Sequence, residues 1–152
     1  MGTQRTFVIL KPDCVLRGLV GKVLQKFEDR GLKIVAMKMI QLDDKILAEH
    51  YAHHKDKKFY PKLTDFMKLS PVITVVLEGE NAVDTVRNIA GKTDGSEAGT
   101  IRNEFSPNEI QENILHASDA LETAKTEIER FFRPGEISSY DNSCEKLKFS
   151  RV

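Results

Sequence analysis

The chain has no tryptophan, only two cysteines and no net charge in its 152 residues. Cys14 and Cys144 lie far apart, and neither has the cysteine or histidine neighbours of a zinc site, which argues against a disulfide scaffold or a zinc finger. We expect both to be reduced thiols in a cytoplasmic protein. The 23 basic and 23 acidic residues cancel, so any binding site for anions must be local.

Long apolar runs are also missing. No run approaches the roughly 18 apolar residues of a membrane span, and the first residues, MGTQRTFVILKPD, hold no apolar stretch of the length found in signal peptides. We therefore expect no membrane partner. The dinucleotide-binding, P-loop and protein-kinase motifs are absent too, so phosphate chemistry in this chain requires another architecture.

The composition is typical of one globular domain over residues 1–152, with 40% hydrophobic and 30% charged residues and no linker or repeat. Apolar runs at 7–10, 34–40 and 72–77 predict three strands, and the pair Ile114-Leu115 predicts a short fourth. From about residue 134 the chain is a polar tail, which we expect to lie on the surface.

Helices are predicted between these strands by apolar residues at helical spacing. Asp43, Asn81 and Asp119 are candidate N-caps of three of them, and Leu121 is expected on the core side of the last helix. Residues 91–113 are predicted to be irregular. When the helical pair inserted at about 43–69 is set aside, the order is βαββαβ, an α+β ferredoxin-like fold with an antiparallel sheet and helices on its faces.

His116 is the most prominent candidate for chemistry. It follows the apolar pair and precedes the small residues Ala117 and Ser118, which leave room for a substrate at the start of a helix that attracts anions. Glu127 borders the apolar face of that helix and can hold one ring nitrogen while the other acts as nucleophile. The alternatives are a buried structural histidine and a solvated glutamate.

Cations near the predicted irregular segment 91–113, the long loop, are candidates for phosphate binding. Arg87 and Arg102 flank this loop, and arginine forks suit phosphate oxygens, although any one such arginine is more often an ordinary surface charge. Lys11 ends the first strand, where a substrate site or a lysine lying along apolar surface are both possible.

Aromatic and imidazole side chains gather between residues 50 and 62. Phe59 lies among lysines and can stack on a base, unless the segment is a plain solvated loop. His50, His53 and His54 near Asp56 allow a metal site, but the surrounding lysines favour a surface that faces anions.

Together these residues resemble the nucleoside diphosphate kinase family over nearly the whole chain. The matching stretches are RTF through KPD (5–13), RGLVG (17–21), HYA through FYP (50–61), GTIR (99–102) and NILHASD (113–119). The resemblance implies a ping-pong reaction. His116 takes the γ-phosphate of a nucleoside triphosphate, usually ATP, and passes it to a nucleoside diphosphate.

The resemblance also implies a role for each matching residue. It implies that Glu127 and Ser118 orient the imidazole. It also implies that Lys11 and Asn113 bind the sugar, and that Lys11 and Tyr51 lie near the transferred phosphate. Phosphate binding and base contacts fall to the remaining residues: His54, Arg87, Thr93 and Arg102 for the phosphates, and Phe59, Leu63 and Ile110 for the base.

Cofactor and assembly follow from the same resemblance. Mg²⁺ is expected on the nucleotide phosphates rather than on a protein ligand cage. A homo-oligomer is expected, a hexamer first, with a tetramer or dimer as alternatives. The loop 91–99 is about two residues shorter than usual in the family and lacks its prolines, and 103–112 is atypical.

The alternative from another functional class is a non-catalytic ferredoxin-like module that binds nucleotides or nucleic acid. The zero net charge and the lack of an RNP-type aromatic strand argue against a specific nucleic-acid partner.

Overall fold

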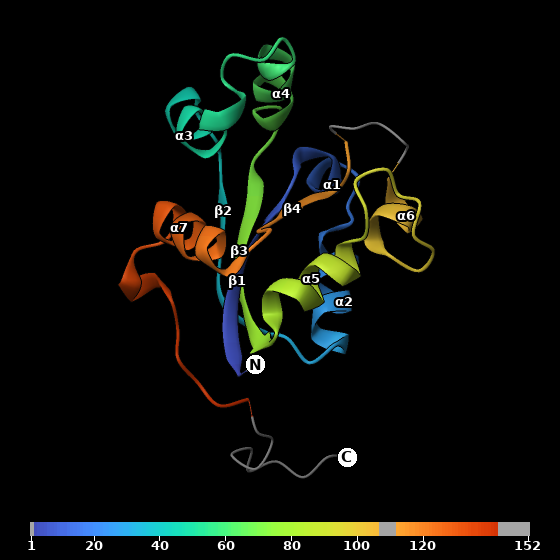
Figure 1. Ribbon diagram of the computed structural model, residues 1–152, viewed down its shortest axis with the longest axis vertical. Helices are drawn as coiled ribbons and strands as arrows, with labels where there is room; N and C mark the ends of the chain where they lie inside the picture. Colours follow the sequence, from blue (N-terminus) through green and yellow to red (C-terminus); the bar gives the residue numbers. More distant parts are fainter. Residues whose placement is uncertain (1, 107–111, 143–152) are drawn as a thin grey trace.

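The computed structural model describes residues 2–106 and 112–142 (Figure 1). Four antiparallel strands form one sheet in the order β2-β3-β1-β4. Their bounds are Thr3–Leu10 (β1), Lys33–Ile40 (β2), Val72–Glu80 (β3) and Leu115–Ala117 (β4). This order, with helices between the strands, confirms the predicted α+β ferredoxin-like architecture.

Strand β1 lies between β3 and β4, so both of its edges are paired, and a core cluster covers each of its faces. This position explains its uninterrupted apolar run, because a strand buried on both sides gains from apolar residues at every position. Phe7 and Ile9 belong to one core cluster, and Val8 and Leu10 belong to a second cluster on the opposite face. All four side chains are completely buried.

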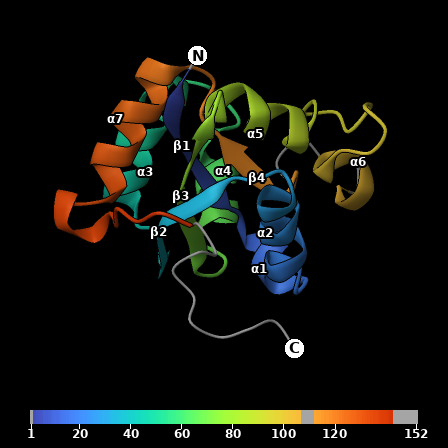
Figure 2. The same cartoon turned by 90° about the horizontal axis from the view of Figure 1, so that it is seen from below.

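Helices cover both faces of the sheet, as Figure 2 shows. On one face lie α2 (Val20–Asp29) and α5 (Ala82–Ala90), whose apolar residues pack with Val8 and Leu10. On the other face lie α7 (Leu121–Phe131) and the inserted pair α3 (Asp44–His50) and α4 (Tyr60–Met67). In the part of the chain that is described, no helix is long and apolar enough to cross a membrane.

Four short helices lie where the sequence predicts none. They are α1 (Pro12–Leu16), η1 (Ala52–His54), α6 (Ile101–Phe105) and η2 (Pro134–Glu136). Helix α6 lies within the segment predicted to be irregular and is capped by Thr100, whose side chain accepts from the Asn103 amide. Helices of three to five residues are too short to show the 3.6-residue period on which the prediction depends.

The helix starts were predicted with mixed success. Asp43 caps α3, because its side chain accepts from the Ile46 amide at 2.9 Å. Asn81 is the N-cap of α5 as predicted, but it adopts a left-handed backbone with φ of 48° and makes no side-chain capping bond. The prediction for Asp119 was wrong, because Ala120 is the N-cap of α7.

Leu121 was also wrongly predicted to be in the core. It is 51% exposed and lines a surface groove of about 730 Å³ between α7 and the beginning of β1. Ile128 and Phe132 form part of the same groove.

The described part of the polar tail lies along the free edge of β2. The Ser138 amide donates to the Val35 carbonyl at 2.7 Å, and the Tyr140 hydroxyl donates to the Ile34 carbonyl. Beyond this contact, Met37 and Met39 of β2 are more than half exposed. The second half of this edge strand therefore presents apolar side chains to the surface.

Gly91 joins α5 to the long loop in a conformation that glycine alone adopts without strain. Its φ is 84° and its ψ is 176°, and a Cβ there would lie 2.2 Å from Thr100 Oγ1. Its carbonyl accepts from Arg102 Nη1 at 2.8 Å. Gly91 thus permits a close approach between the end of α5 and the start of α6.

We predict that Gly91→Ala lowers the free energy of unfolding by about 1–3 kcal/mol, because it adds both backbone strain and a clash with Thr100. Gly18→Ala is the matched control, since Gly18 also has a positive φ of 67° but has open space around its Cβ position. Urea denaturation at one protein concentration measures both. Equal losses in the two variants would show that the contact with Thr100 is unimportant.

Candidate active site

His116 lies in the middle of β4, paired with Ile9 of β1. Leu115 and Ala117 on either side belong to the core cluster under α2 and α5. Because side chains alternate along a strand, the His116 ring lies on the opposite face, toward α7. It is 24% exposed, so the ring is held by the protein and still open to solvent.

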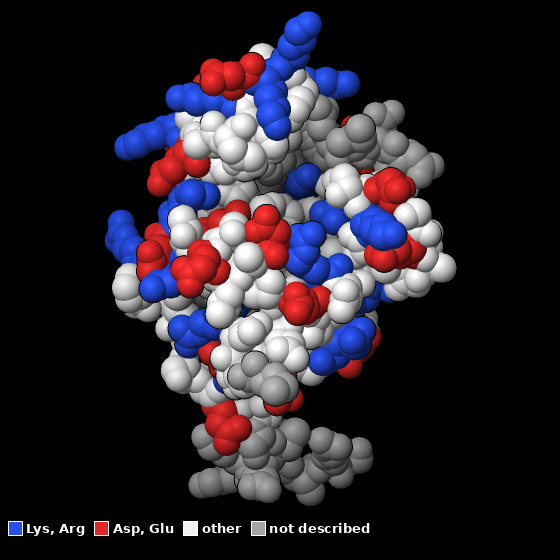
Figure 3. Space-filling view, viewed as in Figure 1, with Lys and Arg blue, Asp and Glu red and all other residues white. Residues whose placement is uncertain are grey.

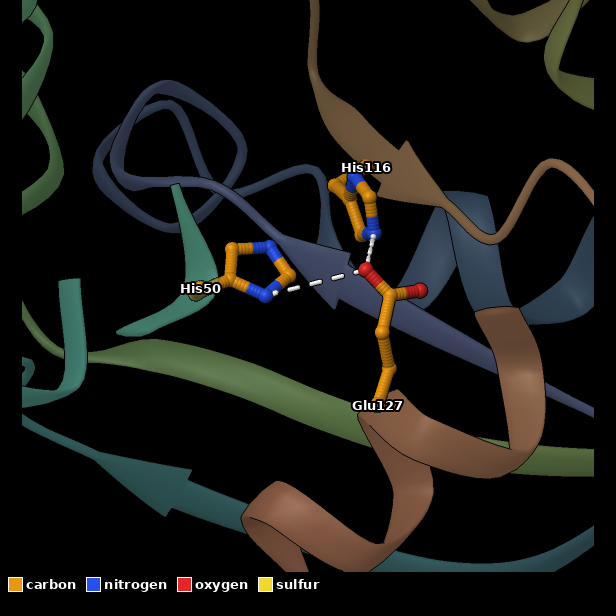
Figure 4. Close-up of side chains that lie close together, drawn as sticks. All are labelled: His50, His116 and Glu127. Carbon is orange, nitrogen blue, oxygen red and sulfur yellow. Dashed lines mark hydrogen bonds and ion pairs between the residues drawn. The ribbon is translucent and has the colours of Figure 1, made fainter. Parts of the chain in front are cut away.

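Glu127 of α7 holds this ring. It shares the buried face of the helix with Ala124, Ile128 and Phe131, whereas the sequence placed it only at the border of that face. Its Oε2 lies 2.7 Å from His116 Nε2 (Figure 4). Its Oε1 accepts from the Ser118 hydroxyl at 2.5 Å.

These contacts determine the protonation of both groups. Burial acts to raise the pKa of Glu127, but the hydrogen bond and charge of His116 and the hydrogen bond from Ser118 outweigh it, and the pKa falls below its usual value. An ionised Glu127 can only accept, so His116 carries a proton on Nε2. Its other nitrogen, Nδ1, points away from Glu127 in Figure 4 and is the ring nitrogen left for another partner.

His50, at the end of α3, is a neighbour of this pair that the sequence analysis did not identify. Its side chain is 2% exposed, and its ring stands nearly perpendicular to that of His116 at a centroid distance of 4.8 Å. Burial, followed by the charge of His116, lowers the pKa of His50 to about 3, so it is neutral. The only signal for this position was that residues 46, 47, 50 and 51 share one apolar helical face.

Among the described residues, His50, His116 and Glu127 are the group whose ligand atoms lie close enough for a metal ion, all within 4.8 Å. The predicted grouping of His50 with His53, His54 and Asp56 is therefore not the one that forms. Mg²⁺ prefers oxygen ligands, and both oxygens of Glu127 already accept hydrogen bonds. This group does not fit Mg²⁺.

A second part of the site surrounds Lys11, at the end of β1. Lys11 Nζ donates to Asn113 Oδ1 at 2.8 Å, and the side chain is almost completely buried. Burial, followed by the charge of Arg102, lowers the pKa of Lys11 to about 8. Burial and the charge of Arg87 likewise lower the pKa of Arg102 to about 10, so three cations share one region.

Figure 3 shows this region from outside. Lys and Arg side chains gather where the surface is hollowed between the α3–α4 pair at the top of the view and α5 and α6 below it. The grouping explains how a chain with no net charge has a local site for anions.

Arg102 is fixed by three hydrogen bonds to backbone carbonyls. Its Nε, Nη1 and Nη2 donate to the carbonyls of Asn113, Gly91 and Leu115 at 3.2, 2.8 and 2.7 Å. A guanidinium has five N–H groups, so two remain for another acceptor. Arg102 therefore joins the end of α5 to β4 and also supplies positive charge beside His116.

The turn before His116 is strained. Ile114 is a β-branched residue with φ of 76°, which is rare for its type. Its amide donates to Asp13 Oδ2 at 3.0 Å, and its carbonyl accepts from the Lys11 amide at 2.9 Å. Asp13 of α1 thus holds the turn that sets Asn113 beside Lys11, a role the sequence analysis did not predict.

The remaining predicted residues lie on the inserted helical pair and the loop. Tyr51 is buried against His50, and burial together with the charge of Glu127 raises its pKa. Phe59 is 42% exposed, with its ring 5.1 Å from that of His54, whereas Leu63 is buried in the core.

The loop residues are less closely tied to this centre. Thr93 is exposed in the loop after Gly91, and Arg87 is exposed in the last turn of α5. Ile110 lies outside the described residues, as does Cys144.

A histidine whose ring is held by a buried carboxylate beside a group of cations is an arrangement typical of a phosphate-transferring enzyme, here on a ferredoxin-like fold. The family model for nucleoside diphosphate kinase matches residues 4–137. The chain belongs to the nucleoside diphosphate kinase family and is an enzyme of that class.

Individual relatives agree with this result. The nucleoside diphosphate kinase of Parabacteroides distasonis is 49% identical over 140 residues, 91% of each chain, and that of Pyrococcus horikoshii is 45% identical over 94% of each. The structure of the Halobacterium salinarum nucleoside diphosphate kinase in complex with CDP superposes with a TM-score of 0.90 at 37% identity. The match covers 95% of this chain and 97% of that one.

We predict that Ser118→Ala lowers the free energy of unfolding at pH 7 by about 1–3 kcal/mol, because an ionised buried acceptor loses a donor. The native pKa of Glu127 is depressed, so its ionised form stabilises the fold above its unfolded pKa of about 4.3, and this contribution is lost as the pH falls through the native pKa. The loss in the variant should therefore shrink in acid.

Urea denaturation of Ser118→Ala at neutral and acidic pH measures both effects. Thr126→Ala on the exposed face of α7 is the control, with a change of less than about 0.5 kcal/mol and no such pH dependence. A loss at Ser118 that stays constant down to pH 3 would contradict the assigned ionisation of Glu127.

Proposed function

We propose that this chain transfers the γ-phosphate of a nucleoside triphosphate, usually ATP, to a nucleoside diphosphate through a phosphohistidine on His116. The observation that carries the proposal is the 2.7 Å contact between His116 Nε2 and Glu127 Oε2, which directs Nδ1 away from the carboxylate. The Nδ1 lone pair forms a bond to the γ-phosphorus, and the bond to the bridging oxygen breaks. The diphosphate leaves with that electron pair, and an acceptor diphosphate reverses the step.

Charge stabilisation is the second element of the proposal. Nδ1 gains a bond while Nε2 stays protonated, so the ring becomes positive, and the ionised Glu127 stabilises it. Lys11, Arg87 and Arg102 would bind the phosphates, together with Thr93 and His54. Burial and the charge of Arg102 lower the pKa of Lys11, and burial and the charge of Arg87 lower the pKa of Arg102; this supports the role, because crowded cations favour a bound anion.

Nucleoside binding would use the hollow below the inserted helical pair. Asn113 and Lys11 would bind the sugar hydroxyls, and Tyr51 would lie near the transferred phosphate. The half-exposed Phe59 would stack on the base, with Leu63 and Ile110 nearby. The CDP complex of the Halobacterium salinarum relative supports a nucleotide site in this fold.

Mg²⁺ would reach the site on the nucleotide phosphates as part of the substrate. The chemistry of the residues supports this route, because the histidine-rich group around His116 does not fit Mg²⁺, whereas phosphate oxygens do. When bound there, the ion would neutralise phosphate charge during transfer.

Assembly and location complete the proposal. We infer a homo-oligomer, a hexamer first, and its support is the apolar edge of β2 with exposed Met37 and Met39. A cytoplasmic location is supported by the low cysteine content and the buried free thiol of Cys14. The alternative of a non-catalytic module leaves the arrangement of His116, Ser118 and Glu127 without a purpose.

We predict that His116→Ala abolishes phosphoenzyme formation and turnover while nucleotide binding is largely kept, because the imidazole forms the covalent bond and adds little ground-state affinity. Incubation with γ-labelled ATP should label the wild-type chain in an acid-labile, alkali-stable form. His53→Ala removes an exposed histidine and should still be labelled. Label retained on His116→Ala would refute the assignment.

We predict broad base specificity, because stacking on Phe59 uses a face that every base has. Purine and pyrimidine diphosphates, ribose and deoxyribose alike, should be accepted in competition kinetics. Phe59→Ala should weaken binding of each by on the order of 1–3 kcal/mol, with Phe59→Tyr as the control that keeps the ring. Selection of one base by the wild type would disprove the stacking model.

A further inference from the structure

Arg130 lies one helical turn after Glu127 on α7, a spacing at which opposite charges usually pair. Within the described part of the chain, however, no contact of 4.0 Å or less joins these two side chains. Arg130 Nη1 lies 2.9 Å from His50 Nδ1, and its Nε lies 3.7 Å from the exposed Glu49. Arg130 therefore contacts His50 and Glu49 rather than the carboxylate of Glu127.

His50 is this partner, and its protonation follows from the contact. A guanidinium can only donate, so His50 Nδ1 must accept with its lone pair. The same Nδ1 lies 3.6 Å from Glu127 Oε2. Since both atoms are acceptors, this approach is not a hydrogen bond, and His50 lies between the arginine and the carboxylate without binding Glu127.

We propose that His50 is a positioning residue that holds Arg130 through Nδ1 and so keeps the guanidinium off Glu127, reserving the carboxylate for His116. The proposal rests on the proposed role of His116 as nucleophile. It assigns to His50 no contact with substrate and no proton transfer.

The physical reason is a competition for one carboxylate oxygen. A guanidinium left unpaired in this partly buried position, where Arg130 is 14% exposed, costs free energy, and a charge-assisted bond to Glu127 would remove that cost. Glu127 Oε2 would then bind Arg130 in place of His116 Nε2–H. The His116 proton would no longer be fixed on Nε2, and the cationic phosphohistidine would lose its counter-charge.

Two variants of nearly equal shape test the acceptor. In His50→Asn the side-chain oxygen takes the place of Nδ1, whereas His50→Leu keeps a similar shape without an acceptor. We expect His50→Leu to slow phosphoenzyme formation from γ-labelled ATP by on the order of 10–100-fold, and His50→Asn to stay within a few-fold of wild type. Equal losses in both variants, or no loss in His50→Leu, would overturn the proposal.

Removing the competitor provides a second test. In the double variant His50→Leu/Arg130→Met no guanidinium is left to capture Glu127, so phosphoenzyme formation should recover at least tenfold relative to His50→Leu. Glu49→Gln disturbs only the exposed side of Arg130 and is the control, with an unchanged rate. A double variant as slow as His50→Leu would show that Arg130 is not the cause.

Nitrogen-15 spectra of the histidines give a readout that is independent of turnover. The measurement on the wild type does not depend on the folding of any variant. In the wild type His50 should show an unprotonated Nδ1, and His116 should be protonated on Nε2 alone. In His50→Leu the His116 signals should shift toward a mixture of tautomers. A protonated His50 Nδ1 in the wild type would overturn the proposal, whereas failure of the wild type to form phosphoenzyme would count against the proposed function instead.

Discussion

The hydrogen bond between His116 Nε2 and Glu127 Oε2 joins a strand to a helix across one face of the sheet, and the arrangement of that face depends on it. Placing an ionised carboxylate in an apolar layer is costly unless its oxygens are satisfied. Here the ring and the Ser118 hydroxyl satisfy one oxygen each. This requirement couples the rotation of α7 to the position of β4. The packing of the helix and the orientation of the His116 ring are therefore set together.

The turn that precedes His116 is held by hydrogen bonds of its backbone groups. Ile114 adopts a left-handed conformation that its β-branched side chain disfavours, and Asp13 together with the Lys11 backbone stabilises it. The strained turn sets Asn113 next to Lys11 and starts β4 in the register that pairs His116 with Ile9. The backbone strain at Ile114 is thus offset by hydrogen bonds to Lys11 and Asp13, which lie just after β1.

Sequence reasoning succeeded where a pattern is local and failed where a contact is distant. The apolar run of β1 and the burial of Ala124, Ile128 and Phe131 on α7 follow from periodicity and were predicted, whereas Glu127 was placed only at the border of that face. Short helices lack a full period and were missed. His50 was interpreted with its sequence neighbours, because only the fold brings α3 against His116. A sequence pattern also cannot show that three N–H groups of Arg102 donate to backbone carbonyls.

The loop after α5, residues 91–99, is held by hydrogen bonds. It lacks the prolines that would stiffen it, but it forms its own bonds: Gly95 donates to the Lys92 carbonyl, and Asn103 Nδ2 donates to the Gly95 carbonyl at 2.8 Å. Arg102 then ties its first residue, Gly91, to β4. The order of the loop comes from hydrogen bonds, and Arg102 alone among these residues joins it to the strand that carries His116.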